Sequence, residues 1–168
     1  MLLIGLLSAC ATAPVPPAPG EQALSGRLSV RIAALADQPE RAVSLAFDLR
    51  GSPQAGQIDF STPLGSVVAQ ARWAPGSVRL ITPQGERSFN DLDSLSREAL
   101  GEVVPVAALF DWLQGRPWPG APSQAEAGGQ AFVQLGWRVD LARLAEGQVL
   151  ALRAQAPAVT VRALLDRP

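Results

Sequence analysis

The chain has 168 residues, of which 48% are hydrophobic and 17% are charged, and its net charge is −1. This length predicts one domain with a sizeable core. Histidine and tyrosine are absent and every basic residue is arginine, which excludes Ser-His-Asp and Cys-His nucleophiles and most zinc sites. No segment is basic enough for a nucleic-acid groove. We therefore expect no enzyme, no metal or cofactor, and no nucleic-acid partner.

The first 20 residues have the pattern of a lipoprotein signal followed by a tether. An apolar run ends in Leu7-Ser8-Ala9, and Cys10 follows as the only cysteine. We expect residues 1–9 to be a signal peptide that starts upstream of Met1, since the first charged residue is Glu21 and such signals begin with a basic segment. Cys10 is the expected lipid-attachment site. Residues 10–20 are rich in Pro and Ala and would span about 30 Å in a polyproline conformation.

From Leu24 onward the pattern predicts antiparallel strands. Polar and apolar residues alternate with a period of two, which is typical of half-buried strands, and Gly- and Pro-containing turns separate the runs. The predicted strands are 27–32, 43–50, 57–60, 66–73, 77–82 and 86–89.

The period then becomes helical for two short segments. Asn90 or Asp91 would cap the first helix, and Gly101 would end it. The second would begin near Pro105 and end before Gly115. A loop is predicted over 118–129, and strands return at 131–134, 136–141, 149–155 and 159–165. The predicted fold is mainly β (α+β): an incomplete antiparallel β-barrel of about ten or eleven strands over residues 21–168, with short helices plugging its hydrophobic mouth.

Several motifs, taken with the segment around Cys10, resemble the LolB family of outer-membrane lipoprotein receptors. They are Gly26-Arg27-Leu28, Thr62-Pro63-Leu64-Gly65, Val104-Pro105-Val106, Leu109, Trp112-Leu113-Gln114-Gly115, Pro117 and Gln134-Leu135-Gly136-Trp137. Their order and spacing cover the chain from Gly26 to its end. One departure is that family members usually carry a helix before the first strand, whereas only Glu21-Gln22-Ala23 separates Gly20 from Leu24.

The resemblance implies a receptor that takes acylated lipoproteins from the periplasmic carrier LolA and inserts them into the outer membrane without nucleotide. The expected location is the periplasmic face of the outer membrane, in agreement with Ala11 rather than Asp after Cys10, and a monomer is expected. The alternatives are another hydrophobic-ligand lipoprotein, such as a glycolipid carrier, and a structural scaffold lipoprotein with a filled core.

Acyl chains require an apolar concave surface, which one face of a curved sheet supplies from side chains two apart. Any such residue could equally be an ordinary core position. The candidate acyl-chain cavity residues are Leu28, Val30, Leu45, Phe47, Ile58, Phe60, Leu80, Leu109, Phe110, Leu113, Val139 and Leu152.

The segment Pro63, Leu64 and Gly65 is the candidate membrane-insertion loop. Proline and glycine on either side predict a tight turn that projects Leu64 outward. The position matches a protruding leucine of the LolB family. The resemblance links that leucine to the delivery of lipoproteins into the bilayer. Trp112 and Trp137 also match family positions, and we expect both to pack the fold rather than bind a ligand.

Overall fold

The computed structural model describes residues 22–166, so the expected signal peptide, Cys10 and the tether lie outside the described residues. The elements in chain order are β1 (Gln22–Ile32), β2 (Arg41–Gly51), β3 (Gly56–Ser61), β4 (Val67–Ala74), β5 (Ser77–Thr82), β6 (Gly85–Phe89), α1 (Leu92–Leu100), α2 (Val106–Trp112), β7 (Ser123–Ala125), β8 (Ala131–Gln134), β9 (Trp137–Asp140), the 3₁₀ turn η1 (Leu144–Glu146), β10 (Gln148–Arg153) and β11 (Val159–Leu165).

All eleven strands form one antiparallel sheet, in the order β6-β5-β4-β3-β2-β1-β11-β10-β9-β8-β7. Neighbours in the sheet are also neighbours in the chain, except where β1 pairs with β11 and Val30 lies opposite Val161. The order ends at β6 on one side and β7 on the other, so the sheet is not closed. The predicted incomplete antiparallel barrel of ten or eleven strands is therefore confirmed.

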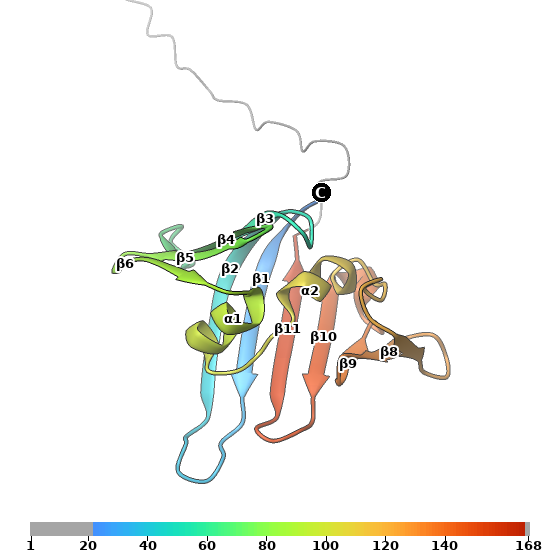
Figure 1. The fold of residues 1–168 in the computed structure, drawn as a ribbon. Helices are drawn as coiled ribbons and strands as arrows, with labels where there is room; N and C mark the ends of the chain where they lie inside the picture. The colour runs from blue at the N-terminus through green and yellow to red at the C-terminus, as the bar shows by residue number, and fades with distance from the viewer. Residues whose placement is uncertain (1–21, 167–168) are drawn as a thin grey trace, which may run out of the picture.

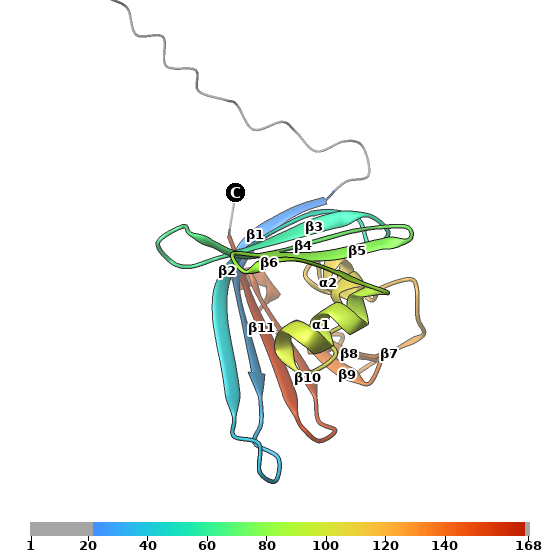
Figure 2. The same cartoon turned by 60° about the vertical axis from the view of Figure 1, so that its left-hand side comes forward.

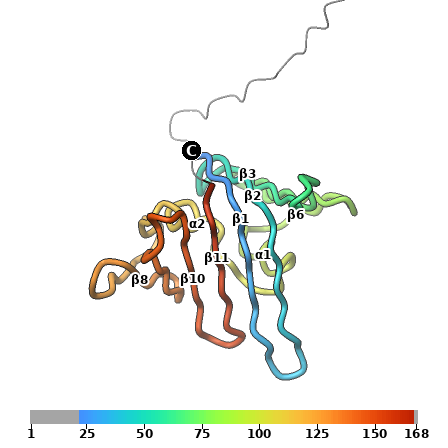
Figure 3. The backbone as a smooth tube through the Cα atoms, turned by 180° about the vertical axis from the view of Figure 1, so that it is seen from behind, coloured from blue at the N-terminus to red at the C-terminus, as the bar shows by residue number. Residues whose placement is uncertain are grey.

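The sheet is strongly bent, and both helices lie on its concave side. In Figures 1 and 2, β3 to β6 form an upper layer, while β1, β2, β10 and β11 run downward from it. Figure 3 shows the convex side, where these four long strands lie side by side. A register shift between Phe60 and Ser61 interrupts the β3–β4 ladder, and irregularities of this kind bend and twist a strand locally.

The alternation read from the sequence corresponds to the two faces of the sheet. In β1, Leu28, Val30 and Ile32 are buried on the concave side, while Arg27 and Arg31 are exposed on the convex side. β11 repeats the pattern with Val159, Val161 and Ala163, which are buried. The concave face is therefore largely apolar, as the hydrophobic effect requires of a face covered by helices.

The cap of α1 follows the sequence prediction. The carboxylate of Asp91 accepts a hydrogen bond from the backbone N–H of Ser94 at 2.6 Å. Gly101 ends the helix with φ of 82°, a left-handed conformation that glycine adopts without a steric penalty. α2 follows after Pro105 and is only 7 residues long, so its stability depends on packing rather than on helix propensity.

Two predicted boundaries were wrong. The predicted loop over 118–129 contains the short edge strand β7, whose three residues are all exposed and therefore carry no alternation. β1 begins at Gln22 rather than near residue 27, because its first residues pair with the end of β2 as far as Gly51. The described chain thus begins directly as a strand of the sheet.

Candidate functional site: an apolar cavity under the first helix

A cavity of about 230 Å³ lies between α1, the start of α2 and the concave face of β1 to β5. Its walls are Leu28, Val30, Val43, Leu45, Ile58, Phe60, Ala69, Ala71, Leu80, Leu92, Leu95, Ser96, Ala99, Leu100, Val104, Val106 and Leu109. Every lining residue except Ser96 is apolar. The Ser96 hydroxyl donates to the Asp93 carbonyl at 3.1 Å and accepts from the Val104 N–H at 3.2 Å, so it offers the cavity little polar character.

Seven of the twelve residues predicted to line an acyl-chain cavity line this space. They are Leu28, Val30, Leu45, Ile58, Phe60, Leu80 and Leu109. The predicted set omits α1, whose Leu92, Leu95 and Leu100 also line the cavity. It also missed Ala69 and Ala71, whose short side chains leave part of the space empty. Alternation with Trp73 along β4 is the signal that could have identified them.

Five predicted cavity residues lie elsewhere. Phe47, Phe110, Leu113 and Val139 are buried in the packed core. Phe110 makes an edge-on contact with Trp73 at a ring-centroid distance of 5.8 Å, so its ring fills space beside the cavity. Leu152 is 38% exposed and lies on the convex side, because Val149 and Ala151 take the buried positions of β10. It was placed on the wrong face.

The interior is therefore divided into a filled half and a hollow half. In the filled half, Trp112 contacts Phe132 and Trp137 at centroid distances of 6.4 and 6.3 Å. Trp112 and Trp137 are buried, in agreement with the structural role expected for them. Aromatic side chains of this size occupy most of the space between α2 and β8 to β10. The hollow half, under α1, has mainly aliphatic side chains in its walls, with Phe60 but no tryptophan among them.

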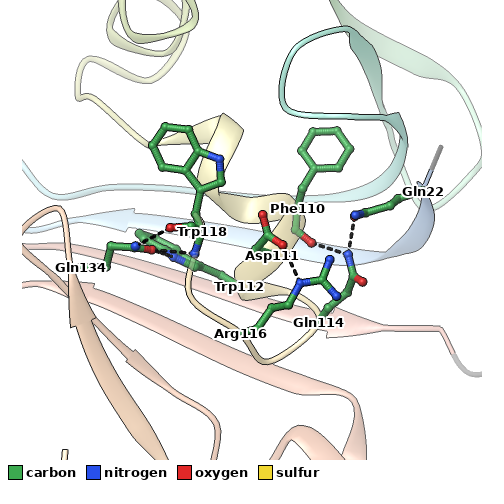
Figure 4. A network of polar contacts seen from close by, with 8 residues as sticks. All are labelled: Gln22, Phe110, Asp111, Trp112, Gln114, Arg116, Trp118 and Gln134. Carbon is green, nitrogen blue, oxygen red and sulfur yellow. Dashed lines mark hydrogen bonds and ion pairs between the residues drawn. The ribbon is translucent and has the colours of Figure 1, made fainter. Parts of the chain in front are cut away.

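A buried amide fixes α2 and the loop after it to β8. The Gln134 carbonyl oxygen accepts from Trp112 Nε1 at 2.7 Å and from the Trp118 N–H at 2.9 Å. Its amide nitrogen donates to the carbonyl oxygens of Trp118 and Ala121, both at 2.7 Å. Figure 4 shows this network between Trp112, Trp118 and Gln134. Because Gln134 is 1% exposed, each of these bonds would be costly to leave unmade.

A second group of contacts fixes the end of α2. Figure 4 shows it on the side of the view away from Gln134. Asp111 accepts from Arg116 Nε at 2.6 Å, and Gln114 donates to the Phe110 carbonyl at 2.6 Å and contacts Gln22 of β1. Asp111 is almost fully buried, whereas Arg116 is about half exposed. α2 is thus attached to both β1 and β8 by polar groups inside the fold.

α1 is attached by its apolar face, which includes the buried Leu95, and by two ion pairs at its C-terminal end. Arg87 of β6 pairs with Glu98 at 2.5 Å, and both side chains are substantially exposed. Arg153 of β10 pairs with Glu102 in the α1–α2 connection at 2.6 Å. The hydrogen bond from Ser94 lowers the pKa of Asp91, which keeps the capping carboxylate ionised. Of the two, only the Arg87–Glu98 pair is exposed and contributes little to stability. Because the apolar face of α1 borders the cavity rather than a filled core, we expect α1 to be held less firmly than α2.

The segment from Thr62 to Ser66 forms a tight loop between β3 and β4. The Thr62 N–H donates to the Ser66 carbonyl and the Gly65 N–H to the Thr62 carbonyl, both at 2.9 Å. Gly65 has φ of 84°, which explains the need for glycine there. Leu64 is 94% exposed and Val67 is 58% exposed. In Figure 2 this loop projects from the bend of the sheet, away from the helices.

Residues 22–166 contain no helix that is long and apolar enough to cross a membrane. The same part of the chain has no group of three or more Cys, Asp or Glu side chains placed to hold a metal ion. The distinctive features of the described residues are thus an apolar cavity and an exposed leucine at the tip of a loop.

An open antiparallel sheet that curls around two helices and encloses an apolar hollow defines a half-barrel. The family model described as "Outer membrane lipoprotein LolB" matches residues 21–163. The chain therefore belongs to the LolB family of outer-membrane lipoproteins, which act in lipoprotein localisation.

Similar proteins support the same assignment. The chain is 36% identical over 180 residues to the outer-membrane lipoprotein LolB of Bordetella pertussis, covering 99% of this chain and 90% of the relative. It is 39% identical over 148 residues to the LolB of Thiobacillus denitrificans, covering 80% and 75% respectively. A shorter match, 33% identical over 100 residues, is to the LolB of Chromobacterium violaceum and covers 60% of this chain and 55% of the relative.

Proposed function

We propose that this protein accepts acylated lipoproteins from a LolA-type periplasmic carrier into the cavity under α1 and inserts them into the outer membrane without nucleotide. The observation that carries the proposal is the chemistry of the cavity wall, in which Ser96 is the only polar residue. A wall of this kind suits hydrocarbon chains and provides no groups for chemical catalysis. A scaffold lipoprotein would have no use for such a cavity.

The energetics of acyl chains require direct transfer between two proteins. Burial of a methylene group is worth about 0.8 kcal/mol, so a chain with about ten buried methylenes gains about 8 kcal/mol that exposure to water would remove. A mouth-to-mouth contact between carrier and receptor keeps the chains out of water throughout. Since no nucleotide is used, transfer then proceeds from lower to higher affinity, and a monomeric receptor is sufficient.

The size of the cavity indicates that the protein changes shape when it takes cargo. About 230 Å³ is less than the roughly 300–1,000 Å³ typical of sites for small ligands, and a lipoprotein carries two or three acyl chains. α1 is the element best placed to move outward, because its apolar face borders the cavity and its ion pair with β6 is exposed, while buried hydrogen bonds fix α2. We propose that α1 moves away from β5 and β6 as the chains enter.

Delivery into the bilayer is assigned to the loop of Pro63, Leu64 and Gly65. An apolar side chain that is 94% exposed at the tip of a constrained turn loses little conformational entropy when it enters the membrane surface. Lipid attachment at Cys10 and the tether to residue 20 would keep the half-barrel within about 30 Å of the membrane. The proposed location is the periplasmic face of the outer membrane.

The decisive experiment is a transfer assay with a purified complex of carrier and lipoprotein. The full chain carrying Cys10→Ser, which removes the site of its own lipid, is incubated with the complex in the absence of ATP. Recovery of the lipoprotein on this chain supports the receptor function. If the lipoprotein stays on the carrier while this chain is folded, the protein belongs instead to the class of other hydrophobic-ligand lipoproteins.

A further inference from the structure

The strands carry three arginines on the otherwise apolar concave face. Arg41, Arg87 and Arg153 share the strand alternation of the buried or cavity-lining residues in β2, β6 and β10. Arg87 pairs with Glu98 at 2.5 Å and Arg153 with Glu102 at 2.6 Å. Arg41 differs from both, since its side chain makes no ion pair or hydrogen bond with any residue in the range 22–166.

The guanidinium of the exposed Arg41 lies beside the end of α1. It lies so close to the Cα of Gly101, at the end of α1, that a β-carbon there would collide with the guanidinium nitrogens. Two neighbouring carboxylates are engaged elsewhere: Glu40, which precedes Arg41, faces Arg31 at 3.6 Å, and Glu102, which follows Gly101, pairs with Arg153. Arg41 thus presents N–H donors beside the end of α1 with no acceptor among the residues that the structure describes.

This guanidinium lies where the apolar cavity opens. A second hollow of about 180 Å³ is lined by Arg41 and shares Val30, Val43, Ala99 and Leu100 with the larger cavity. Val43 is 40% exposed, so the opening reaches solvent at this point. The combined space is apolar inside and carries one free cation at its mouth.

We infer that the cavity also binds a phospholipid, with the acyl chains under α1 and the phosphate on Arg41. A phosphate follows directly on the glycerol of a diacyl phospholipid, whereas the diacylglyceryl group on a lipoprotein cysteine carries no anion. The planar fork of a guanidinium matches phosphate oxygens with two parallel hydrogen bonds. The inference rests on the proposed acyl-binding role of the cavity and adds a second ligand to it.

Phospholipid binding has a consequence for cargo transfer. A membrane-anchored receptor is surrounded by phospholipids, so its cavity would be occupied when no lipoprotein is present. Arrival of cargo would then be an exchange of one set of acyl chains for another, and the apolar wall would not be exposed to water between cycles.

The test uses calorimetric titration of the full chain carrying Cys10→Ser with three probes. The two lipid probes are kept below their critical micelle concentrations. Dihexanoyl phosphatidylglycerol carries both chains and phosphate, dihexanoylglycerol carries the chains alone, and inorganic phosphate carries the anion alone. We expect the phospholipid to bind about tenfold more tightly than dihexanoylglycerol, as one charge-assisted hydrogen-bonded pair allows. Arg41→Gln should abolish that difference, and Arg41→Lys should retain only part of it.

Arg27→Gln is the matched control, because Arg27 lies on the convex face of β1, opposite Ala46 of β2, and its loss releases no carboxylate beside Arg41. It should leave all three affinities unchanged. Equal binding of the two lipids, or an unchanged preference in Arg41→Gln, overturns the inference while leaving the acyl cavity intact. Binding of inorganic phosphate as tight as that of the phospholipid also overturns it. If neither lipid binds, the acyl-binding role of the cavity in the proposed function is refuted as well.

Discussion

Filling the cavity from β4 tests the acyl-binding role most directly. Ala71 is 2% exposed and lies between Ile58 of β3 and Leu80 of β5 in the register of the sheet. All three residues line the cavity. The substitution Ala71→Leu places a branched side chain in the empty space without changing the charge or the backbone requirements of the strand.

The magnitude follows from the volume that the new side chain occupies. Leucine adds roughly three methylene equivalents, worth about 2.4 kcal/mol at about 0.8 kcal/mol each when buried. Any overpacking by the new side chain costs about 1–3 kcal/mol. The gain and the cost nearly cancel, so the free energy of unfolding should change little. Acyl carbons displaced from the same space lose the same 2.4 kcal/mol, which predicts roughly 50-fold weaker binding of an acyl ligand.

The assay combines urea unfolding with binding of a fluorescent fatty acid and with transfer of lipoprotein from the carrier. Ala74→Leu is the matched control, since Ala74 lies in the same strand with its side chain exposed. We expect Ala71→Leu to remain folded but to bind and accept poorly, and Ala74→Leu to behave as the unmodified chain. Normal acceptance by folded Ala71→Leu would refute the assignment of acyl chains to this cavity.

Three further predictions concern the loop, the buried amide and the helix cap. Leu64→Glu should still take cargo from the carrier but fail to insert it into vesicles. The control Leu135→Glu changes an exposed leucine of the β8–β9 turn and should insert cargo normally. Insertion of cargo by Leu64→Glu would contradict the role assigned to Leu64. Gln134→Leu leaves four buried polar groups without their partner, so urea unfolding should show a loss of roughly 3 kcal/mol or more, and a loss below about 1 kcal/mol would contradict the network's role. Because its pKa is lowered on folding, Asp91 stabilises the fold above its ordinary pKa, and that contribution disappears as the pH falls through the lowered value. Asp91→Asn should therefore reduce the loss of stability between neutral and acidic pH. An unchanged pH dependence of stability would argue against the cap.

The architecture could be predicted from the sequence because alternation and turn residues are local signals. Runs such as Val43 to Arg50 alternate clearly, and the Gly and Pro turns fix where each strand ends. The cap at Asp91 and the stop at Gly101 are equally local. β7 gave no such signal, because a three-residue edge strand with no buried side chain has the composition of a loop.

The division of the interior could not be predicted, because it depends on how distant side chains share one space. Val30 and Val139 both face inward on their strands, but Val30 borders the cavity and Val139 is fully buried in the core. The difference arises from Trp112 and Trp137, which fill the space on the side of Val139. Leu152 was misplaced for a simpler reason, since a shift of one residue in the assumed alternation reverses the face.

In the described chain, the sheet ends at β6 and β7 without pairing them to each other. In a closed barrel, strand number and stagger together fix the diameter, and the lumen cannot widen without breaking hydrogen bonds. This sheet has no such constraint, so its radius of curvature depends on what the concave face encloses. Under the proposed function, cargo lipoproteins that differ in the length and number of their acyl chains would be accommodated by bending the same eleven strands, with every ladder of the sheet kept intact.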